Sequence, residues 1–273
     1  MAELRNRDEI YGLSNRISLT LTHFAKGAYP VFSATPQALS VNRMLGIFEN
    51  PNGAENFIRC GDDKLPLIPG TVYFIPAYLP AQVRLDDRTL FVSIQFSLEL
   101  HSGVELFSMY KHIRSEYRPE LVARLVEIFD SDRQLLLAVE LRKHVFAFVY
   151  DMLDGSAETP PDLAARFAPY AAVLDHIAAR CTAGMRVAEL AKIARMPRET
   201  FTRRFTADTG ITPKRFLDRQ LLRRASELLR RPHTTAREVA AELEFSSEFV
   251  FSRFFRKQSG LSPGLYRRQY RPW

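Results

Sequence analysis

A tandem repeat in the last hundred or so residues constrains the fold of this chain more than any other feature. Two segments, 187–216 and 236–268, have identical residues at five positions related by a single offset of 50 residues. The matched residues are Phe201, Arg203, Phe205, Gly210 and Pro213 in the first copy and Phe251, Arg253, Phe255, Gly260 and Pro263 in the second. Because Gly and Pro are uncommon residues, five matches at one offset indicate a duplicated structural unit.

Each copy is typical of two short helices that meet at a steep angle, as in a helix-turn-helix. The first predicted helix is short and apolar on one side, and the second buries two phenylalanines four residues apart. Gly210 and Gly260 are predicted to end the second helices as left-handed C-caps. Before the turn the offset is 49, so the second copy has one extra residue where its second helix begins. A longer helix over 213–229 is predicted to join the two units.

The outward faces of the two second helices carry arginine and small polar side chains, the residue types that read base edges in a major groove. The candidate DNA-binding residues are Arg198, Glu199, Thr202 and Arg203 in the first unit and Glu248, Phe249, Ser252 and Arg253 in the second. Phe249 is apolar, so it either contacts a thymine methyl group or packs inside. Since the two faces differ, the units are expected to read different half-sites.

The positive charge of the chain is confined to its second half. Residues 166–273 hold 22 Lys and Arg against 10 Asp and Glu, a net charge of +12, whereas residues 1–165 hold 16 against 21, a net charge of −5. A surplus of this kind favours a polyanionic partner. Arginine supplies 19 of the 22 cations, which suits forked contacts to phosphates and guanines.

Residues 170–268 resemble the DNA-binding domain of AraC/XylS-family transcription regulators. The segment FSRFFRKQSGLSPGLYRR has that family's spaced aromatics, Gly, Ser-Pro and Tyr-Arg, and the repeat matches its two helix-turn-helix units. The resemblance implies a bacterial regulator, more often an activator, that works with RNA polymerase and has a cupin-like N-terminal domain for sensing or dimerisation. Arg195 and Glu244 stand where the family usually has glycine, and either would be strained if the backbone is left-handed there.

The first half of the chain is predicted to be rich in β-strands and then helical. From about 30 to 100, short apolar runs alternate with Pro and Gly turns, and Val92, Ile94 and Phe96 alternate with less apolar neighbours. This pattern favours an antiparallel barrel or jelly roll with helices over about 103–153 packed on it. Apolar residues outside the main helical stripe mark either a dimer contact or more core; they are Leu136, Val139, Phe146 and Val149.

The sequence therefore predicts an α+β chain in two domains. A cupin-like sensing or dimerisation domain is expected over 1–155, a linker over 156–169 and an all-α DNA-binding domain over 170–273. The linker is rich in Gly, Ser, Thr and Pro and coincides with the change in charge. Two distant cysteines, no secretory signal and no apolar span of about 20 residues favour the cytoplasm over a membrane.

Polar residues on the predicted strands are candidates for an effector pocket, and they are Arg43, Arg59, Tyr73 and Gln95. The six histidines form no H-x-H pair, so no metal, cofactor or enzymatic activity is expected. The leading hypothesis is a regulator that binds double-stranded DNA and responds to a small molecule. One alternative is a regulator whose N-terminal domain only dimerises or binds a protein partner, and another is a barrel enzyme fused to a DNA-binding tail.

Overall fold

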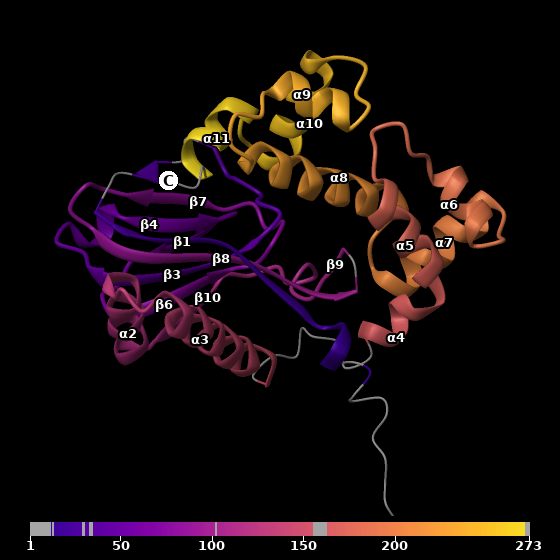
Figure 1. Ribbon diagram of the computed structural model, residues 1–273. Helices are drawn as coiled ribbons and strands as arrows, with labels where there is room; N and C mark the ends of the chain where they lie inside the picture. The colour runs from indigo at the N-terminus through magenta and orange to yellow at the C-terminus, as the bar shows by residue number, and fades with distance from the viewer. Residues whose placement is uncertain are drawn as a thin grey trace, which may run out of the picture.

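The computed structural model describes residues 12, 14–28, 31–32, 35–101, 103–154 and 163–270. Within these ranges, strands dominate the first part of the chain and helices the second (Figure 1). The strands are β1 (Ser18–Gly27), β2 (Val31–Phe32), β3 (Asn42–Glu49), β4 (Phe57–Cys60), β5 (Asp63–Pro66), β6 (Thr71–Ile75), β7 (Gln82–Leu85), β8 (Leu90–His101), β9 (Val104–Glu105) and β10 (Arg114–Tyr117). The helices are α2 (Pro119–Asp130), α3 (Gln134–Asp154), α4 (Leu163–Phe167), α5 (Ala171–Arg180), α6 (Val187–Ile193), α7 (Arg198–Thr209), α8 (Pro213–Arg230), α9 (Ala236–Glu242), α10 (Glu248–Ser259) and α11 (Pro263–Tyr270).

The strands form two antiparallel sheets that face each other. One sheet has the order β1-β8-β3-β6-β10, with β9 paired to β8, and the other has the order β2-β7-β4-β5. No ladder joins the two sheets among the strands described, so the domain is an open sandwich of the jelly-roll kind rather than a closed barrel. The expectation of an antiparallel β-rich domain followed by a helical domain is confirmed.

Strand β8 has the two unlike faces that its alternation predicts. Val92, Ile94 and Phe96 point into a core shared with α2 and α3. The alternate residues Phe91, Ser93 and Gln95 point toward the space between the sheets. Two polar side chains of β8, Ser93 and Gln95, are therefore held on the inner face of the sandwich, opposite the second sheet.

The boundaries of the predicted segments need two corrections. The strands begin at Ser18 rather than near 30, because β1 pairs along most of its length with β8. The helices expected from about 103 begin at Pro119, because β9 and β10 pair with β8 and β6. Both differences come from long-range pairing, which local periodicity does not report.

Helix α3 buries the predicted stripe and leaves a second stripe uncovered. Leu141, Val145, Phe148 and Met152 are buried in the core below the sheet. Val149 is buried as well, so it belongs to the core and not to a second surface. The exposed apolar residues of this helix are Leu135, Leu136, Val139, Phe146 and Tyr150.

The buried residues of the first repeat form one continuous core with the sandwich, α2 and α3, whereas the second repeat has a separate core. Helix α8 connects the two repeats (Figure 1). The helical domain includes α4, whose Phe167 packs against Phe205 and Phe216, so this domain reaches back into the segment 156–169. The remainder of that segment, 156–162, lies outside the described residues. In the part of the chain that the structure describes, no helix is long and apolar enough to cross a membrane.

Candidate nucleic-acid interface and ligand cavity

The first helix-turn-helix unit consists of α6 and α7. Phe201 and Phe205 are almost fully buried on the inner face of α7. The ring of Tyr170 packs on Phe205 with a centroid distance of 4.8 Å. Helix α7 ends at Gly210, whose φ of 71° is left-handed, as the sequence predicts. Anchored along one face in this way, α7 presents its opposite face outward.

The second unit, α9 and α10, repeats this arrangement with stronger caps. Thr235 and Glu238 form a capping box at the start of α9. The Ser247 hydroxyl accepts a hydrogen bond from the Val250 amide at the start of α10. The helix ends at Gly260, where φ is 82°. Its longer turn, five residues against four, accounts for the change of offset from 49 to 50.

Both turns are left-handed at the residues where glycine is missing. Arg195 has a φ of 53° and Glu244 a φ of 57°. The next amide in each turn reaches back to the preceding helix, over 3.0 Å from Met196 to Ala191 and 2.8 Å from Phe245 to Ala240. The turns are thus not remodelled to suit a side chain. Each carries the steric cost of a Cβ atom in this region of backbone space.

The structure brings the eight candidate DNA-binding residues to the outer faces of the two second helices. Six are exposed and two, Thr202 and Ser252, are half-buried. Phe249 does not pack inside, because 73% of it is exposed. Sequence reasoning omitted Val250, which is also exposed and lies beside Phe249 in the first turn of α10.

The arginines of the outer faces differ from those of α8 in their partners. Arg223 and Arg224 on α8 form ion pairs with Glu227, and Arg224 also pairs with Glu242. Arg203 and Arg253 form no ion pair with any residue that the structure describes. Unpaired exposed guanidinium groups at repeat-related positions leave their charge available to a polyanion.

A small cavity of about 80 Å³ lies between the two sheets. Three polar residues on adjacent strands form one wall: His23 of β1 and Arg43 of β3 both lie opposite Gln95 of β8. The remaining wall is largely apolar, with Leu45, Ile75, Val83, Leu85 and Phe91. Gln269 and Tyr270 of α11 complete the lining, so the helical domain contributes directly to this cavity.

Arg43 is the unusual group in the cavity. Only 8% of the residue is exposed, and its Nε and Nη2 atoms are buried without a hydrogen-bond partner. Burial lowers the pKa of Arg43 below its usual value. The Oε1 atom of Gln95 beside it is also buried without a partner. Because an isolated buried cation is costly, this wall is suited to an anionic group that would accept from the guanidinium.

Two of the four candidate effector-binding residues lie elsewhere. Arg59 is exposed on β4, where its guanidinium lies over the Phe57 ring at 5.1 Å. The Tyr73 hydroxyl donates to the Pro66 carbonyl over 2.6 Å and accepts from the Ile68 amide over 2.9 Å, which leaves it no role in the cavity.

Sequence reasoning missed His23 and Tyr270 as cavity residues. Burial and the nearby charge of Arg230 lower the pKa of His23, which favours its neutral form. The Tyr270 ring meets the His23 ring edge-on at 6.5 Å. The alternation of side chains along β1 could have indicated that His23 faces the cavity. For Tyr270 no such signal exists, because no local pattern places the end of α11 at this cavity.

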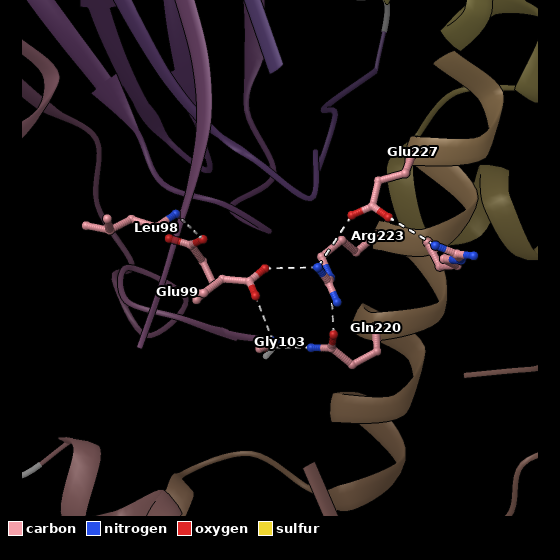
Figure 2. A network of polar contacts seen from close by, with 8 residues as sticks. Leu98, Glu99, Gly103, Gln220, Arg223 and Glu227 are labelled. Atoms are coloured by element: carbon pink, nitrogen blue, oxygen red, sulfur yellow. Dashed lines mark hydrogen bonds and ion pairs between the residues drawn. The ribbon is translucent and has the colours of Figure 1, made fainter. Parts of the chain in front are cut away.

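A polar network joins the sandwich to α8 (Figure 2). The Glu99 carboxylate pairs with Arg223 over 3.1 Å and accepts from the Gly103 amide over 2.8 Å. Gln220 of α8 donates to the Gly103 carbonyl over 2.6 Å. These contacts are half-buried or buried, so they hold the connecting helix at a fixed place on the sandwich.

The sandwich also contacts both recognition helices at repeat-related points. A Cβ atom added at Gly210 would lie 2.6 Å from the Met109 Cε atom, and one at Gly260 would collide with the Pro36 carbonyl oxygen. The Ala38 amide donates to the Ser259 carbonyl over 3.0 Å. Both recognition helices therefore meet the sandwich at their C-terminal ends.

Comparison with known proteins identifies the repeat. Residues 190–269 match a family described as a helix-turn-helix domain. The HTH-type transcriptional regulator MtrA of Neisseria gonorrhoeae is 34% identical over 76 residues, which are 28% of this chain and 25% of that protein. A Streptomyces lividans protein named as an AraC-like transcription regulator is 34% identical over 82 residues, 30% of this chain and 27% of its own length. The chain thus spans about a quarter of these relatives.

Structural similarity extends over nearly the whole chain. ToxT from Vibrio cholerae, solved with an unsaturated fatty acid bound, superposes with a TM-score of 0.62. The match covers 92% of this chain and 95% of ToxT at 12% identity, so it shows a shared fold. A second ToxT structure, with (E)-4-(8-methylnaphthalen-1-yl)but-3-enoic acid bound, has a TM-score of 0.57. Both domains of the chain therefore have a solved counterpart.

Proposed function

We propose that this chain is a sequence-specific DNA-binding transcription regulator that responds to a small molecule. Its C-terminal domain belongs to the helix-turn-helix domains of AraC-type regulators. The observation that carries the proposal is the pair of repeat-related helices, α7 and α10, with exposed arginines that have no ion-pair partner among the described residues. Helix α8 joins the two units, so both helices would enter one face of the same duplex.

Each outer face is proposed to read its own half-site. Arg203 and Arg253 would donate two hydrogen bonds to guanine or contact phosphate, and Thr202 and Ser252 would bind base edges or phosphate. The acidic residues Glu199 and Glu248, which accept from cytosine, and Arg198 and Phe249 complete the two sets. Since the sets differ, one molecule would bind a non-palindromic site.

A gel-shift titration with the chain's own promoter region tests this function. Specific binding should weaken steeply as salt rises, because each neutralised phosphate releases counterions. A promoter fragment that binds no better than random DNA of equal length would contradict sequence-specific binding there. Selection from random duplexes then supplies the sequence that the protein prefers.

The proposed effector is a small carboxylate held by Arg43. Support comes from the unpaired guanidinium of Arg43, the neighbouring Gln95 amide and the apolar remainder of the cavity. The carboxylate would satisfy both unpartnered nitrogens, and an apolar body would lie against the inner sheet faces. ToxT, which shares the fold, binds an unsaturated fatty acid. With about 80 Å³ available, a longer ligand would have to widen this cavity.

Thermal unfolding of the full chain with carboxylates of increasing chain length tests the effector. The matched controls are the corresponding primary amides, which keep the size but lack the charge. We expect carboxylates alone to raise the melting temperature, by mass action on the folded state. Equal effects of acid and amide would contradict recognition by charge.

Effector binding is proposed to act on DNA binding through α11 and α8. Tyr270 lines the cavity, and its hydroxyl donates to Gln37 over 3.3 Å, so a ligand that moves this wall also moves α11. The network at Glu99 and Arg223 would transmit a shift of the sandwich to the connecting helix.

We further propose that the chain activates transcription through RNA polymerase, which would bind beside it on the promoter in the cytoplasm.

A second copy of the chain is the proposed occupant of the exposed stripe on α3. Leu135 and Val139 lie at one end of the stripe, and Phe146 and Tyr150 lie at the other. An antiparallel pair of α3 helices would match the two ends, as a two-fold interface requires. Sedimentation at rising concentration tests the dimer, with Val139→Glu expected to keep the chain monomeric.

The uncovered stripe also favours the second candidate function, a regulator whose sandwich only dimerises. The two candidate functions make different predictions for the cavity, because a domain that only dimerises does not need a buried arginine without a partner.

We propose a binding protein rather than an enzyme, in keeping with relatives that are transcriptional regulators. A carboxylate that changes DNA affinity and is recovered unaltered would separate the proposal from both alternatives.

A further inference from the structure

The first turn of α10 carries an exposed apolar pair that α7 lacks. Phe249 is 73% exposed and Val250 is 37% exposed. At the same offset of 50 residues, α7 has Glu199 and Thr200. The buried scaffold of the two helices is otherwise the same, with a Phe pair inside and an arginine outside. The apolar pair is therefore a specific feature of the second recognition helix.

Neither the fold nor the packing of α10 accounts for Phe249. The buried faces of the helix are supplied by Phe251 and Phe255, and Phe245 and Phe254 cover the turn. The Phe249 ring makes no aromatic contact with any residue in the described ranges. Truncating it should thus leave the domain stable, because surface changes of this kind alter stability by about 0.5 kcal/mol or less.

The surroundings of Phe249 point to a partner that combines negative charge with apolar groups. Arg253 lies one turn further along the same face, and it is exposed without an ion-pair partner among the residues described. In the major groove, the only apolar group that a base pair presents is the C5 methyl group of thymine. Arginine and phenylalanine one turn apart would contact a phosphate or guanine and a neighbouring thymine.

We infer that Phe249, supported by Val250, recognises thymine methyl groups in the half-site bound by α10. The inference rests on the proposed function, and it deepens that function by assigning a base to one helix. The half-site of α7 lacks an equivalent aromatic contact, because Glu199 stands at the position of Phe249. Sensitivity to the methyl group should therefore be greater under α10 than under α7.

Replacing thymine by uracil removes this methyl group and keeps every hydrogen bond of the base pair. The protein is first used to select duplexes from random DNA, and the half-site of α10 is identified as the one whose base preference changes in Arg253→Ala. Each thymine in both half-sites is then replaced by uracil, and the dissociation constant is measured by fluorescence anisotropy. We expect at least one replacement under α10 to weaken binding about fourfold, the factor for one buried methyl group of about 0.8 kcal/mol.

Two variants act as matched controls. Phe249→Ala should bind the thymine and uracil duplexes equally well. Phe249→Glu combined with Val250→Thr gives α10 the outward pair of α7, and it should also lose the preference for thymine. Melting temperatures of both variants should equal that of the parent, which separates a lost contact from a lost fold.

Three results would overturn the inference while leaving DNA binding intact. The first is a selected half-site under α10 without thymine, and the second is equal affinity for thymine and uracil at every position there. The third is a uracil effect of the same size in the parent and in Phe249→Ala. If no duplex were selected at all, the proposed function itself would fail, and that outcome is distinct from these three.

Discussion

Replacing Arg43 with methionine tests whether its guanidinium is held in the cavity for a ligand rather than for the fold. Two nitrogens of the guanidinium are buried without a partner, and leaving a polar group in that state costs about 1–3 kcal/mol. Methionine keeps the length and apolar bulk of the side chain but removes the charge. We therefore expect the free energy of unfolding to rise by about 1–3 kcal/mol in the absence of ligand.

Thermal unfolding measures this change, with a gain of about 2–4 °C expected per kcal/mol in a chain of this size. Arg59→Met is the matched control, because Arg59 is exposed on the outer face of β4 and should change stability by about 0.5 kcal/mol or less. Carboxylates should stabilise the parent and the control but not Arg43→Met. A lower melting temperature for Arg43→Met, or an unchanged response to carboxylates, would show that the Arg43 guanidinium is not held for a ligand.

Three further predictions concern strain and charge. Arg195→Gly and Glu244→Gly should each raise the free energy of unfolding by about 0.5–1 kcal/mol, because glycine relieves a left-handed backbone at some entropic cost. Gly260→Ala should destabilise the chain by more than Gly210→Ala, since its Cβ would meet a backbone carbonyl rather than the end of a flexible methionine; chemical denaturation compares the two. Burial raises the pKa of Glu105 to about 8 from 4.5, so the folded chain binds this proton more tightly. Stability should therefore fall as pH rises between these values, and Glu105→Gln should flatten that part of the measured profile.

Each of these predictions has a clear contrary result. Alanine at 195 or 244 keeps the Cβ atom, so a gain as large as that of glycine would exclude backbone strain as the cause. If Gly260→Ala and Gly210→Ala lowered the free energy of unfolding equally, the backbone at Pro36 would be able to move away from the added Cβ atom. A stability profile that keeps the same slope after Glu105→Gln would assign the pH dependence to another group.

The helical domain could be predicted from sequence because its signals are local. The 50-residue offset predicted which Phe pairs are buried on the two recognition helices, and the glycines predicted where these helices end. The family resemblance singled out Arg195 and Glu244 as positions that usually hold glycine, and the structure shows that both are left-handed. Exposure of Phe249 could not be decided, because a one-residue change in helix phase separates an inner from an outer position.

The cavity was harder to predict because it depends on strand register. Arg43 and Gln95 face it since they lie opposite each other on β3 and β8, whereas Tyr73 points to the Pro66 carbonyl from the next strand. A shift of one residue in pairing would exchange such faces, and the sequence does not report pairing partners. Tyr270 reaches the cavity from another domain, over a distance along the chain that no local pattern spans.

Binding of the selected duplex by Arg203→Ala and Arg253→Ala tests whether the chain reads DNA with two recognition helices. We expect each variant to lose about 1–3 kcal/mol of specific binding, to keep the melting temperature of the parent, and to relax base preference in a different half of the site. Anisotropy titrations and a repeated selection measure both effects. Parental affinity in either variant, or a change of preference in the same half for both, would contradict a chain that reads DNA with two recognition helices.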